Sequence, residues 1–394
     1  MNKPIALIVC NAMDDATRLQ RGIVTDSPAA SRKVFMLCNA LRKTGVLPLI
    51  LSLGRGKINN SWQYYPRSVR RVDGNAVIYA PFTQLPVFSQ IYSLFAFVGT
   101  VLILRHHQRK AIIFYNRTNA YIPTLIISSI AGYRRILDLE DGEVEESRKI
   151  TLKGITIWIT YIMFEWLCKS GALLACSALE KKTRIRPVQC YYGIASIKRP
   201  IKKLSRQKIH ILMSGTISPA TGADLLLKSI NIMRSGNNSW ARNLCFEITG
   251  MGSSISDFYA LAKESGKPRV IVHGRLTESK YHVIRNRCNI GLALKPVGGF
   301  LADTTFPSKI IEFASAGLLV LTTDISDVRR VMGNGAVYLN SNNPHDLIQL
   351  LHKIVKNKSR FMISALAGQR AVKKQCSTKQ AGKAVTEFLF RIKQ

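Results

Sequence analysis

Short apolar runs alternate along this chain with segments whose apolar residues recur at helical spacing. In segment 31–45 Val34, Leu37 and Leu41 fall on one face of a helix, and Gly45 is placed to end it. Such alternation is typical of parallel α/β domains. The runs that predict strands in the first half are 4–10, 46–54, 75–80, 111–116 and 134–141.

Segment 195–208 is basic, contains proline and has no apolar periodicity, so we expect a domain boundary there. We therefore predict an N-terminal domain over 1–197 and a second domain over 205–377, both Rossmann-like and doubly wound. Domains of this kind bind their ligands at the carboxyl ends of the parallel strands. We expect these strand ends of the two domains to face a common cleft. The final helical segment, 378–394, could cross back to the first domain.

The second domain repeats the alternation of strands and helices. Beyond the boundary we predict strands at 209–215, 244–253, 269–276, 289–295 and 318–324, and helices at 222–233, 256–265, 279–288, 306–317 and 346–356.

Three segments are more apolar than the rest: 88–104, 121–132 and 155–167. The first approaches the length that spans a bilayer, whereas the others are too short or are interrupted by Glu165. We interpret all three as core or interfacial helices. Their basic flanks, 105–110 and 148–153, would suit an anionic membrane surface, although solvated helix ends explain them as well.

Composition adds a strong charge bias to this globular pattern. The chain has 394 residues, 57 Lys and Arg against 23 Asp and Glu, and a net charge of +34 spread over both halves. A surface of this kind attracts polyanions, among them nucleic acid, lipid headgroups and phosphorylated substrates. No nucleic-acid-binding motif is present, so an anionic membrane is the favoured partner and specific nucleic acid is not expected.

The cysteines and histidines indicate no metal and no disulfide framework. Eight cysteines occur singly, which is typical of a reducing compartment. Residues 1–15 predict a first strand instead of a signal peptide. We therefore expect a cytoplasmic protein, peripheral on the inner face of the plasma membrane, that has no metal and no cofactor.

The motif FPSKIIEFASAG, residues 306–317, places Lys309 in the first turn of a helix, where the helix dipole disfavours a cation. An anion held there by backbone N–H groups and the ammonium would explain it. A chance lysine in so basic a chain is the alternative.

The run from Thr249 to Val328, with TGMGS, HGRL and TTFPSKIIEFASAG, resembles the GT-B glycosyltransferases, specifically the large retaining family 4, also called glycosyl transferases group 1. Its FPSK-x-x-E form is similar to the bacterial surface-polysaccharide assembly branch. The N-terminal half resembles the family more loosely. The resemblance implies the GT-B fold and transfer of a sugar from a nucleotide-diphosphate sugar to a glycan acceptor.

The resemblance also implies which residues hold the donor. Ser308 and Lys309, with the N–H groups after Phe306, would bind its diphosphate. Glu312 matches the second glutamate of the E-x7-E signature, which contacts the ribose; a plain acid on the helix surface is the alternative for Glu312. The full expected donor-binding set is Gly215, Gly250, Gly252, His273, Arg275, Lys295, Thr304, Thr305, Phe306, Pro307, Ser308, Lys309 and Glu312.

Several positions depart from the family pattern. The first glutamate of E-x7-E falls on Thr304, and Asp303 could substitute for it. The Arg and Lys of many members fall on Thr216 and Thr221. The glycine pair of the acceptor-side loop appears as Ala29 and Ala30 in segment 27–31.

An acidic stretch, DLEDGEVEE at 138–146, follows a predicted strand, where cleft chemistry belongs. Many family members have an acceptor-facing histidine close to the position of Asp141. Asp141 or Glu140 could accept a proton from an acceptor hydroxyl or stabilise positive charge on the sugar. The alternative to a catalytic role is that these acidic residues lie at the N-terminus of a helix, where the helix dipole favours negative charge.

We therefore predict a glycosyltransferase whose acceptor is a lipid-linked glycan in polysaccharide biosynthesis, with Asp141, Glu140 and Asp303 as catalytic candidates. A non-catalytic GT-B scaffold, a sugar-nucleotide epimerase of the same fold and a nucleic-acid-binding protein are the alternatives, in that order.

Overall fold

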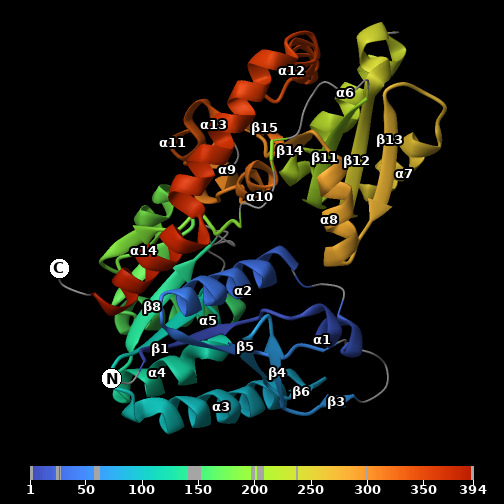
Figure 1. Ribbon diagram of the computed structural model, residues 1–394. Coiled ribbons are helices and arrows are strands. Elements are labelled where there is room, and N and C mark those ends of the chain that lie inside the picture. Colours follow the sequence, from blue (N-terminus) through green and yellow to red (C-terminus); the bar gives the residue numbers. More distant parts are fainter. Residues whose placement is uncertain are drawn as a thin grey trace. The chain divides into compact units, whose positions relative to one another are not determined.

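The computed structural model describes residues 3–23, 26, 28–56, 63–140, 152–196, 200–201, 208–236, 238–298 and 300–391. The chain forms two compact units (Figure 1). The first unit comprises Met1–Ile194 together with Thr378–Gln394, and the second comprises Ala195–Ser377. The predicted bounds were 1–197 and 205–377.

The first unit is built on a sheet of order β10-β9-β8-β7-β1-β2-β5-β4, in which every neighbouring pair is parallel except β4 with β5. Its central strands are buried because apolar residues point to both faces. The strands are β1 (Ile5–Cys10), β2 (Leu47–Ser52), β4 (Ser68–Val72), β5 (Asn75–Tyr79), β7 (Lys110–Tyr115), β8 (Arg134–Leu139), β9 (Gly171–Leu174) and β10 (Val188–Cys190); β3 (Tyr64–Tyr65) pairs separately with β6 (Phe82–Thr83).

Helices cover both faces of this sheet. Alternate residues of β1, such as Ala6 and Ile8, belong to the core that includes α2 (Pro28–Lys43) and α14 (Thr378–Phe390). On the other face Phe114 of β7 packs edge-on against Phe164 of α5. The remaining helices are α1 (Asp15–Gln20), α3 (Pro86–Ile103), α4 (Ile122–Ile130) and α5 (Leu152–Leu167).

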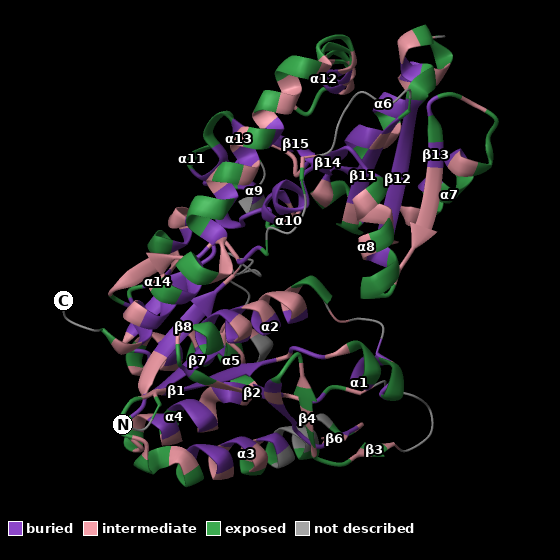
Figure 2. Cartoon of the chain, in the orientation of Figure 1, coloured by how far each residue is buried: buried purple, intermediate pink, exposed green. Residues whose placement is uncertain are grey.

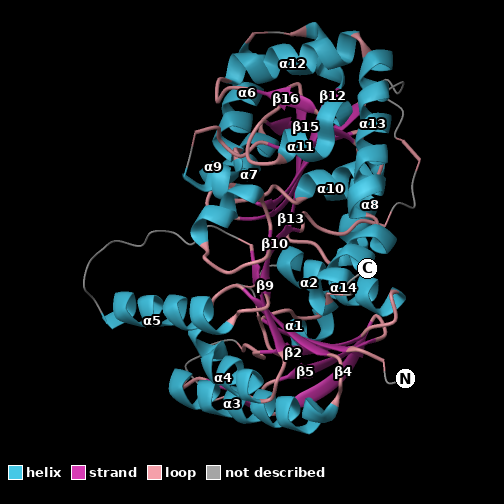
Figure 3. Ribbon diagram, turned by 90° about the vertical axis from the view of Figure 1, so that its left-hand side faces the viewer, coloured by secondary structure: helices cyan, strands magenta, loops and turns pink. Residues whose placement is uncertain are grey.

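The three most apolar segments of the sequence form α3, α4 and α5, as predicted. Figure 3 shows these helices grouped in the first unit. Across the part of the chain that the structure describes, none of the helices combines the length and the apolar character that crossing a membrane requires.

The second unit has a fully parallel sheet of order β13-β12-β11-β14-β15-β16. Figure 2 shows β12 buried along most of its length. The strands are β11 (Ile209–Thr216), β12 (Leu244–Met251), β13 (Arg269–Gly274), β14 (Ile290–Ala293), β15 (Leu319–Thr323) and β16 (Val337–Leu339). The helices are α6 (Ala223–Ser235), α7 (Ile255–Lys263), α8 (Glu278–Arg287), α9 (Phe300–Thr304), α10 (Lys309–Ser315), α11 (Val328–Met332), α12 (Pro344–Lys356) and α13 (Lys358–Cys376).

The last helix, α14, belongs to the core of the first unit. Val385 and Leu389 are buried there, and the Thr44 and Thr386 hydroxyls lie 2.7 Å apart. A side chain at position 382 would meet the Ala40 carbonyl oxygen at 2.7 Å, so Gly382 permits close packing on α2. The prediction of two Rossmann-like α/β domains is confirmed.

Candidate functional site

Glycines at the ends of β11 and β12 allow these strands and the loops after them to approach each other backbone to backbone. Gly215, Gly250 and Gly252 have φ of 111°, 133° and 157°. A Cβ at position 250 would lie 1.8 Å from the Gly215 carbonyl oxygen, and one at position 252 would lie 2.2 Å from that of Ile217. Only glycine therefore fits at positions 250 and 252. These loops lie at the carboxyl end of the sheet, where α/β domains bind ligands.

Lys309 brings a cation to this strand end. It lies in the first turn of a helix, as predicted, and is the first residue of α10; a Cβ at Gly215 would lie 3.6 Å from its Cε. Its Nζ lies 2.9 Å from Glu312 Oε2 and 4.9 Å from the centroid of the Tyr281 ring. The carboxylate one turn further on offsets the unfavourable helix dipole at this position.

Glu312 binds two cations at once. Its Oε1 accepts a hydrogen bond of 3.0 Å from Arg285 Nη1, and its Oε2 accepts the one from Lys309. The carboxylate is half-buried, so a plain surface acid is the wrong description of it. Arg285 comes from α8, one turn after Tyr281.

The Tyr281 hydroxyl joins this group to β11. It lies 3.1 Å from Ser214 Oγ and 3.4 Å from Lys309 Nζ. Burial raises the pKa of Tyr281, and the Glu312 charge raises it further. The donor cluster, defined as Ser214, Tyr281, Arg285, Lys309 and Glu312, thus places two cations and two hydroxyls beside Gly215, a combination that suits an anionic ligand carrying hydroxyl groups.

The turn before α10 is closed on itself. The N–H groups of Ser308, Ile310 and Ile311 donate to the carbonyl oxygens of Phe306, Pro307 and Ser308, at 2.8, 2.9 and 3.2 Å. We expected N–H groups after Phe306 to hold a diphosphate, and these three are engaged in the turn. Among the other predicted positions of this region, Thr304, Thr305, Phe306 and Pro307 are buried, whereas Asp303 and Ser308 are exposed.

Lys295 anchors the same turn from the end of β14. Its Nζ donates to Thr305 Oγ1 at 2.5 Å, and its carbonyl oxygen accepts from Thr323 Oγ1 at 2.6 Å. The predicted donor-binding role of Lys295 therefore competes with a contact to the turn.

His273 is engaged by a buried carboxylate. Glu247 of β12 is fully buried and accepts from His210 at 2.8 Å, from His273 at 2.6 Å and from Arg287 at 2.6 Å. Burial raises the pKa of Glu247, but the hydrogen bonds from Arg287, His273 and His210 outweigh it and lower the pKa overall. His273 was predicted to lie near the donor; Arg275, two residues later, is half-buried.

Three potential metal ligands meet in this network. Ligand atoms of His210, Cys245 and Glu247 lie within 4.8 Å of one another. Both Glu247 oxygens already accept from His or Arg donors, which is the pattern of a buried ion network.

In the first unit, two carboxyl groups lie at the end of β8. Glu140 forms an ion pair with Lys33 Nζ, and its N–H donates to Asn116 Oδ1 at 2.8 Å. Asp138 is buried, and its pKa is raised by burial and by Glu140, although Lys33 lowers it. Lys33 Nζ also lies 4.5 Å from the centroid of the Tyr191 ring. Asp141, the first catalytic candidate, lies outside the described residues.

Sequence reasoning included Asp138 in the acidic stretch without selecting it as a candidate, and it missed Lys33. The spacing Asp138–Leu139–Glu140 at a strand end places both carboxyl groups on one face, which is a usable signal. Lys33 comes from α2, far away in the sequence, and no local pattern indicates it.

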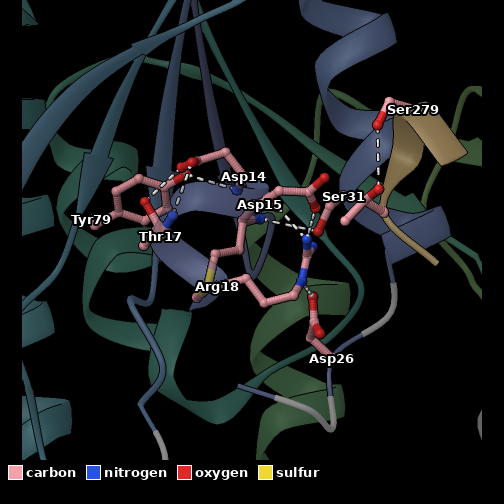
Figure 4. Close-up of polar contacts among 10 residues, drawn as sticks. Asp14, Asp15, Thr17, Arg18, Asp26, Ser31, Tyr79 and Ser279 are labelled. Atoms are coloured by element: carbon pink, nitrogen blue, oxygen red, sulfur yellow. Dashed lines mark hydrogen bonds and ion pairs between the residues drawn. The ribbon is translucent and has the colours of Figure 1, made fainter. Parts of the chain in front are cut away.

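A second network follows β1 (Figure 4). Asp14 caps α1 by accepting from the Thr17 N–H at 3.0 Å, and the Tyr79 hydroxyl donates to it at 2.6 Å. Burial raises the pKa of Asp14, but the bonds from Thr17 and Tyr79 lower it overall. Arg18 binds Asp26 at 2.8 Å. With its donors in place, Asp14 fixes the loop after β1 and is a poor candidate for a proton acceptor.

Comparison with known proteins finds a family match within the second unit. Residues 208–357 match the family described as glycosyl transferases group 1. Among curated relatives, the phosphatidylinositol N-acetylglucosaminyltransferase GPI3 subunit of Saccharomyces cerevisiae is 26% identical over 156 residues, which is 39% of this chain and 32% of that protein. The chain therefore spans about a third of the length of this relative.

Solved structures resemble the whole chain. HepE of Anabaena bound to UDP-glucose aligns with a TM-score of 0.64 at 11% identity, covering 99% of this chain and 100% of that one. Sucrose-phosphate synthase of Thermosynechococcus elongatus gives 0.64 at 11%, covering 99% and 98%. TarM gives 0.66 at 9%, covering 99% of both chains. At these identities the likeness shows the fold, which is GT-B.

Proposed function

We propose that this protein is a glycosyltransferase that moves a sugar from a nucleotide-diphosphate sugar to a glycan acceptor. The observation that carries the proposal is the donor cluster beside Gly215, inside the segment that matches glycosyl transferases group 1. Two cations, a half-buried carboxylate and a glycine-lined strand end suit a ligand that combines phosphates with ribose hydroxyls.

The three charged residues of the cluster and the neighbouring Gly215 each have a role in this proposal. Lys309 neutralises the diphosphate and stabilises the charge that it gains as a leaving group. Glu312 accepts hydrogen bonds from the ribose hydroxyls, and Arg285 holds its carboxylate in place. Gly215 allows the phosphates to approach the backbone closely. The UDP and UDP-glucose bound to HepE favour a uridine donor as the first one to test.

The chemical step needs a group that accepts the acceptor's proton and a group that stabilises the sugar cation. Asp141, Glu140 and Asp303 remain our candidates. Glu140 forms an ion pair with Lys33, and in this proposal its carboxylate stabilises positive charge on the sugar. Retention of anomeric configuration, membership of family 4 and the surface-polysaccharide branch are implied by the sequence resemblance.

We propose further that the acceptor is a lipid-linked glycan and that the protein works peripherally at the inner face of the plasma membrane. The name of the yeast relative, a phosphatidylinositol N-acetylglucosaminyltransferase subunit, supports a lipid acceptor. The net charge of +34 supports an anionic surface.

A non-catalytic scaffold is the second candidate. Thr304 occupies the position of the first signature glutamate and is buried, and Lys295 contacts Thr305. A site that has lost this carboxylate could retain a nucleotide without turning it over.

Release of nucleoside diphosphate from a panel of nucleotide sugars tests the proposal. The native protein should release uridine or guanosine diphosphate in the presence of a glycan acceptor, and Lys309→Ala should reduce this rate by about tenfold or more. The exposed Lys353→Ala on α12 is the matched control and should leave the rate unchanged.

Calorimetry on the same proteins separates the candidates. Nucleotide binding without release by the native protein would favour the scaffold, and conversion of the donor sugar without acceptor would favour an epimerase. Normal kinetics in Lys309→Ala, or loss in both lysine variants, would reject the donor cluster.

A further inference from the structure

Helices α3, α4 and α5 present large apolar side chains to solvent in the first unit. Helix α3 packs against α4, and α4 packs against α5, so the three helices are contiguous. Ile130 is 78% exposed, Trp158 63% and Trp166 70%. We call this surface the apolar helix face and define it by Phe88, Phe95, Ile103, Ile130, Trp158 and Trp166.

The apolar helix face has almost no acidic charge. Helices α3 and α4 contain no charged residue. The only acid of α5, Glu165, turns inward: it forms an ion pair with the buried Arg117, accepts from Thr183 Oγ1 at 2.8 Å and accepts from the Arg184 N–H at 2.6 Å. Burying the Glu165 carboxylate with three donors removes from α5 the one charge that would oppose an anionic surface.

Basic residues lie at the ends of the same helices. The segment after α3 exposes Arg105, His106 and Arg109. After α5, the Lys169 ammonium lies 5.6 Å from the centroid of the Trp166 ring, and Arg184 is next to Glu165. Apolar side chains bordered by tryptophan and by cations match the gradient from acyl chains to charged headgroups at a lipid interface.

We propose that the apolar helix face lies on an anionic lipid bilayer, with Trp158 and Trp166 at the boundary between headgroups and acyl chains. The proposal extends the membrane association proposed above by identifying the surface responsible, and it does not depend on sugar transfer. A bilayer suits the observations better than one protein partner, because the apolar side chains are spread over three helices and edged by cations. Exposed apolar patches of this extent mark interaction sites.

Vesicle sedimentation of the full chain tests the surface. The native protein should sediment with vesicles of phosphatidylcholine and phosphatidylglycerol more than with phosphatidylcholine alone. Trp158 and Trp166 fluorescence should shift to the blue and be quenched by brominated acyl chains. The double variant Ile130→Asp, Trp158→Asp should bind at least about tenfold more weakly, because two charges would enter the apolar boundary.

Ile363→Asp on α13 is the matched control, since Ile363 is 71% exposed but lies in the second unit. It should bind vesicles like the native chain. Circular dichroism confirms that each variant is folded.

Three results would overturn the proposal. One is native protein that stays in the supernatant with every vesicle. Another is equal binding by the double variant, which would place contact on basic residues elsewhere. The third is a concentration-dependent dimer that the double variant abolishes, which would make the face an interface between copies. Nucleoside diphosphate release is measured alongside: its absence would reject the transferase while leaving vesicle binding intact.

Discussion

The carboxyl groups of Asp138 and Glu140 are two residues apart but have different environments. Glu140 has the Lys33 ammonium beside it, whereas Asp138 is buried and lies close to the Glu140 charge. The pKa of Asp138 is therefore raised, and its protonated form is favoured in the folded state.

Asp138→Asn tests this raised pKa through stability. In the native protein the folded state holds a proton that the unfolded state releases above its ordinary pKa, so stability falls as pH rises from about 4 toward neutral, by at most about 1.4 kcal/mol per pH unit. The asparagine variant should lose this decline and be the more stable protein at neutral pH. Urea unfolding midpoints at several pH values measure the difference.

Asp257→Asn on α7, an exposed position, is the control and should leave the pH profile unchanged. If Asp138→Asn is instead less stable than the native protein at neutral pH, Asp138 is ionised in the folded protein and its negative charge stabilises the Lys33 ammonium.

Two members of the donor cluster could be found from the sequence and three could not. Lys309 and Glu312 stand three residues apart in one motif, so the motif indicates both. Tyr281 and Arg285 come from α8, where their i, i+4 spacing puts them on one face, but nothing local shows that this face meets α10. Tyr281 and Arg285 join the donor cluster because of the strand order, which places β11 next to β14.

At the scale of elements, Glu247 links three strands and a helix. Its carboxylate accepts from His210 of β11, His273 of β13 and Arg287 of α8, and it is fully buried on β12. A buried carboxylate with three donors holds these elements in register as long as it is ionised.

Glu247→Gln should destabilise the second unit by about 2–4 kcal/mol, because Arg287 loses its charged partner and one oxygen is lost as an acceptor. Since the pKa of Glu247 is lowered, its contribution is present above the ordinary glutamate pKa and is lost as pH falls through the folded value. The native protein should therefore lose stability at acid pH over a range where the variant does not. Thermal unfolding measured between about pH 3 and 7 gives both quantities.

Glu264→Gln serves as the comparison, since Glu264 is an exposed partner of Arg234 and should change stability by less than about 0.5 kcal/mol. Similar losses of stability in the two variants would mean that the network around Glu247 contributes no more than an exposed ion pair.

The alternation of apolar and helical segments predicted most parallel strands, because each is a continuous apolar run in a buried sheet. The antiparallel hairpin of β4 and β5 was missed, although Asp73 and Gly74 supplied the signal. Both have positive φ, 47° and 78°, as a two-residue turn between antiparallel strands requires. Strand β4 escaped notice because the adjacent Arg70 and Arg71 lie between its two valines, so this edge strand has no continuous apolar run.

At the scale of the whole molecule, the first unit is assembled from two distant parts of the chain. Residues 378–390 supply α14, which covers α2 and contacts β7 and β8, and the second unit is inserted between these parts. The insertion starts and ends at neighbouring points, since the Ala195 N–H donates to the Cys376 carbonyl oxygen at 2.7 Å.

Deleting residues 378–394 should unfold the first unit and leave the second folded. The deletion exposes the surface that Ala381, Val385 and Leu389 cover, at a cost of about 5 kcal/mol or more, comparable with the whole stability of a domain. Trp240, stacked on His352 at 4.8 Å between ring centroids, reports the second unit by its fluorescence, and Trp158 and Trp166 report the first.

In the deletion variant the Trp240 transition in urea should keep its midpoint, whereas Trp158 and Trp166 should show no cooperative transition. Single-tryptophan versions of the chain separate these signals. Cooperative unfolding of the first unit without α14 would show that this helix is dispensable.

The insertion also dictates an order of events on the ribosome. The nascent chain delivers the sheet of the first unit early, but its covering helix emerges only after the entire second unit has been translated. Until then the apolar surface of α2, β7 and β8 that α14 covers is exposed to solvent, and a chaperone that binds apolar segments could bind there. The first unit, whose strands are translated first, is therefore the last of the two units to be completed.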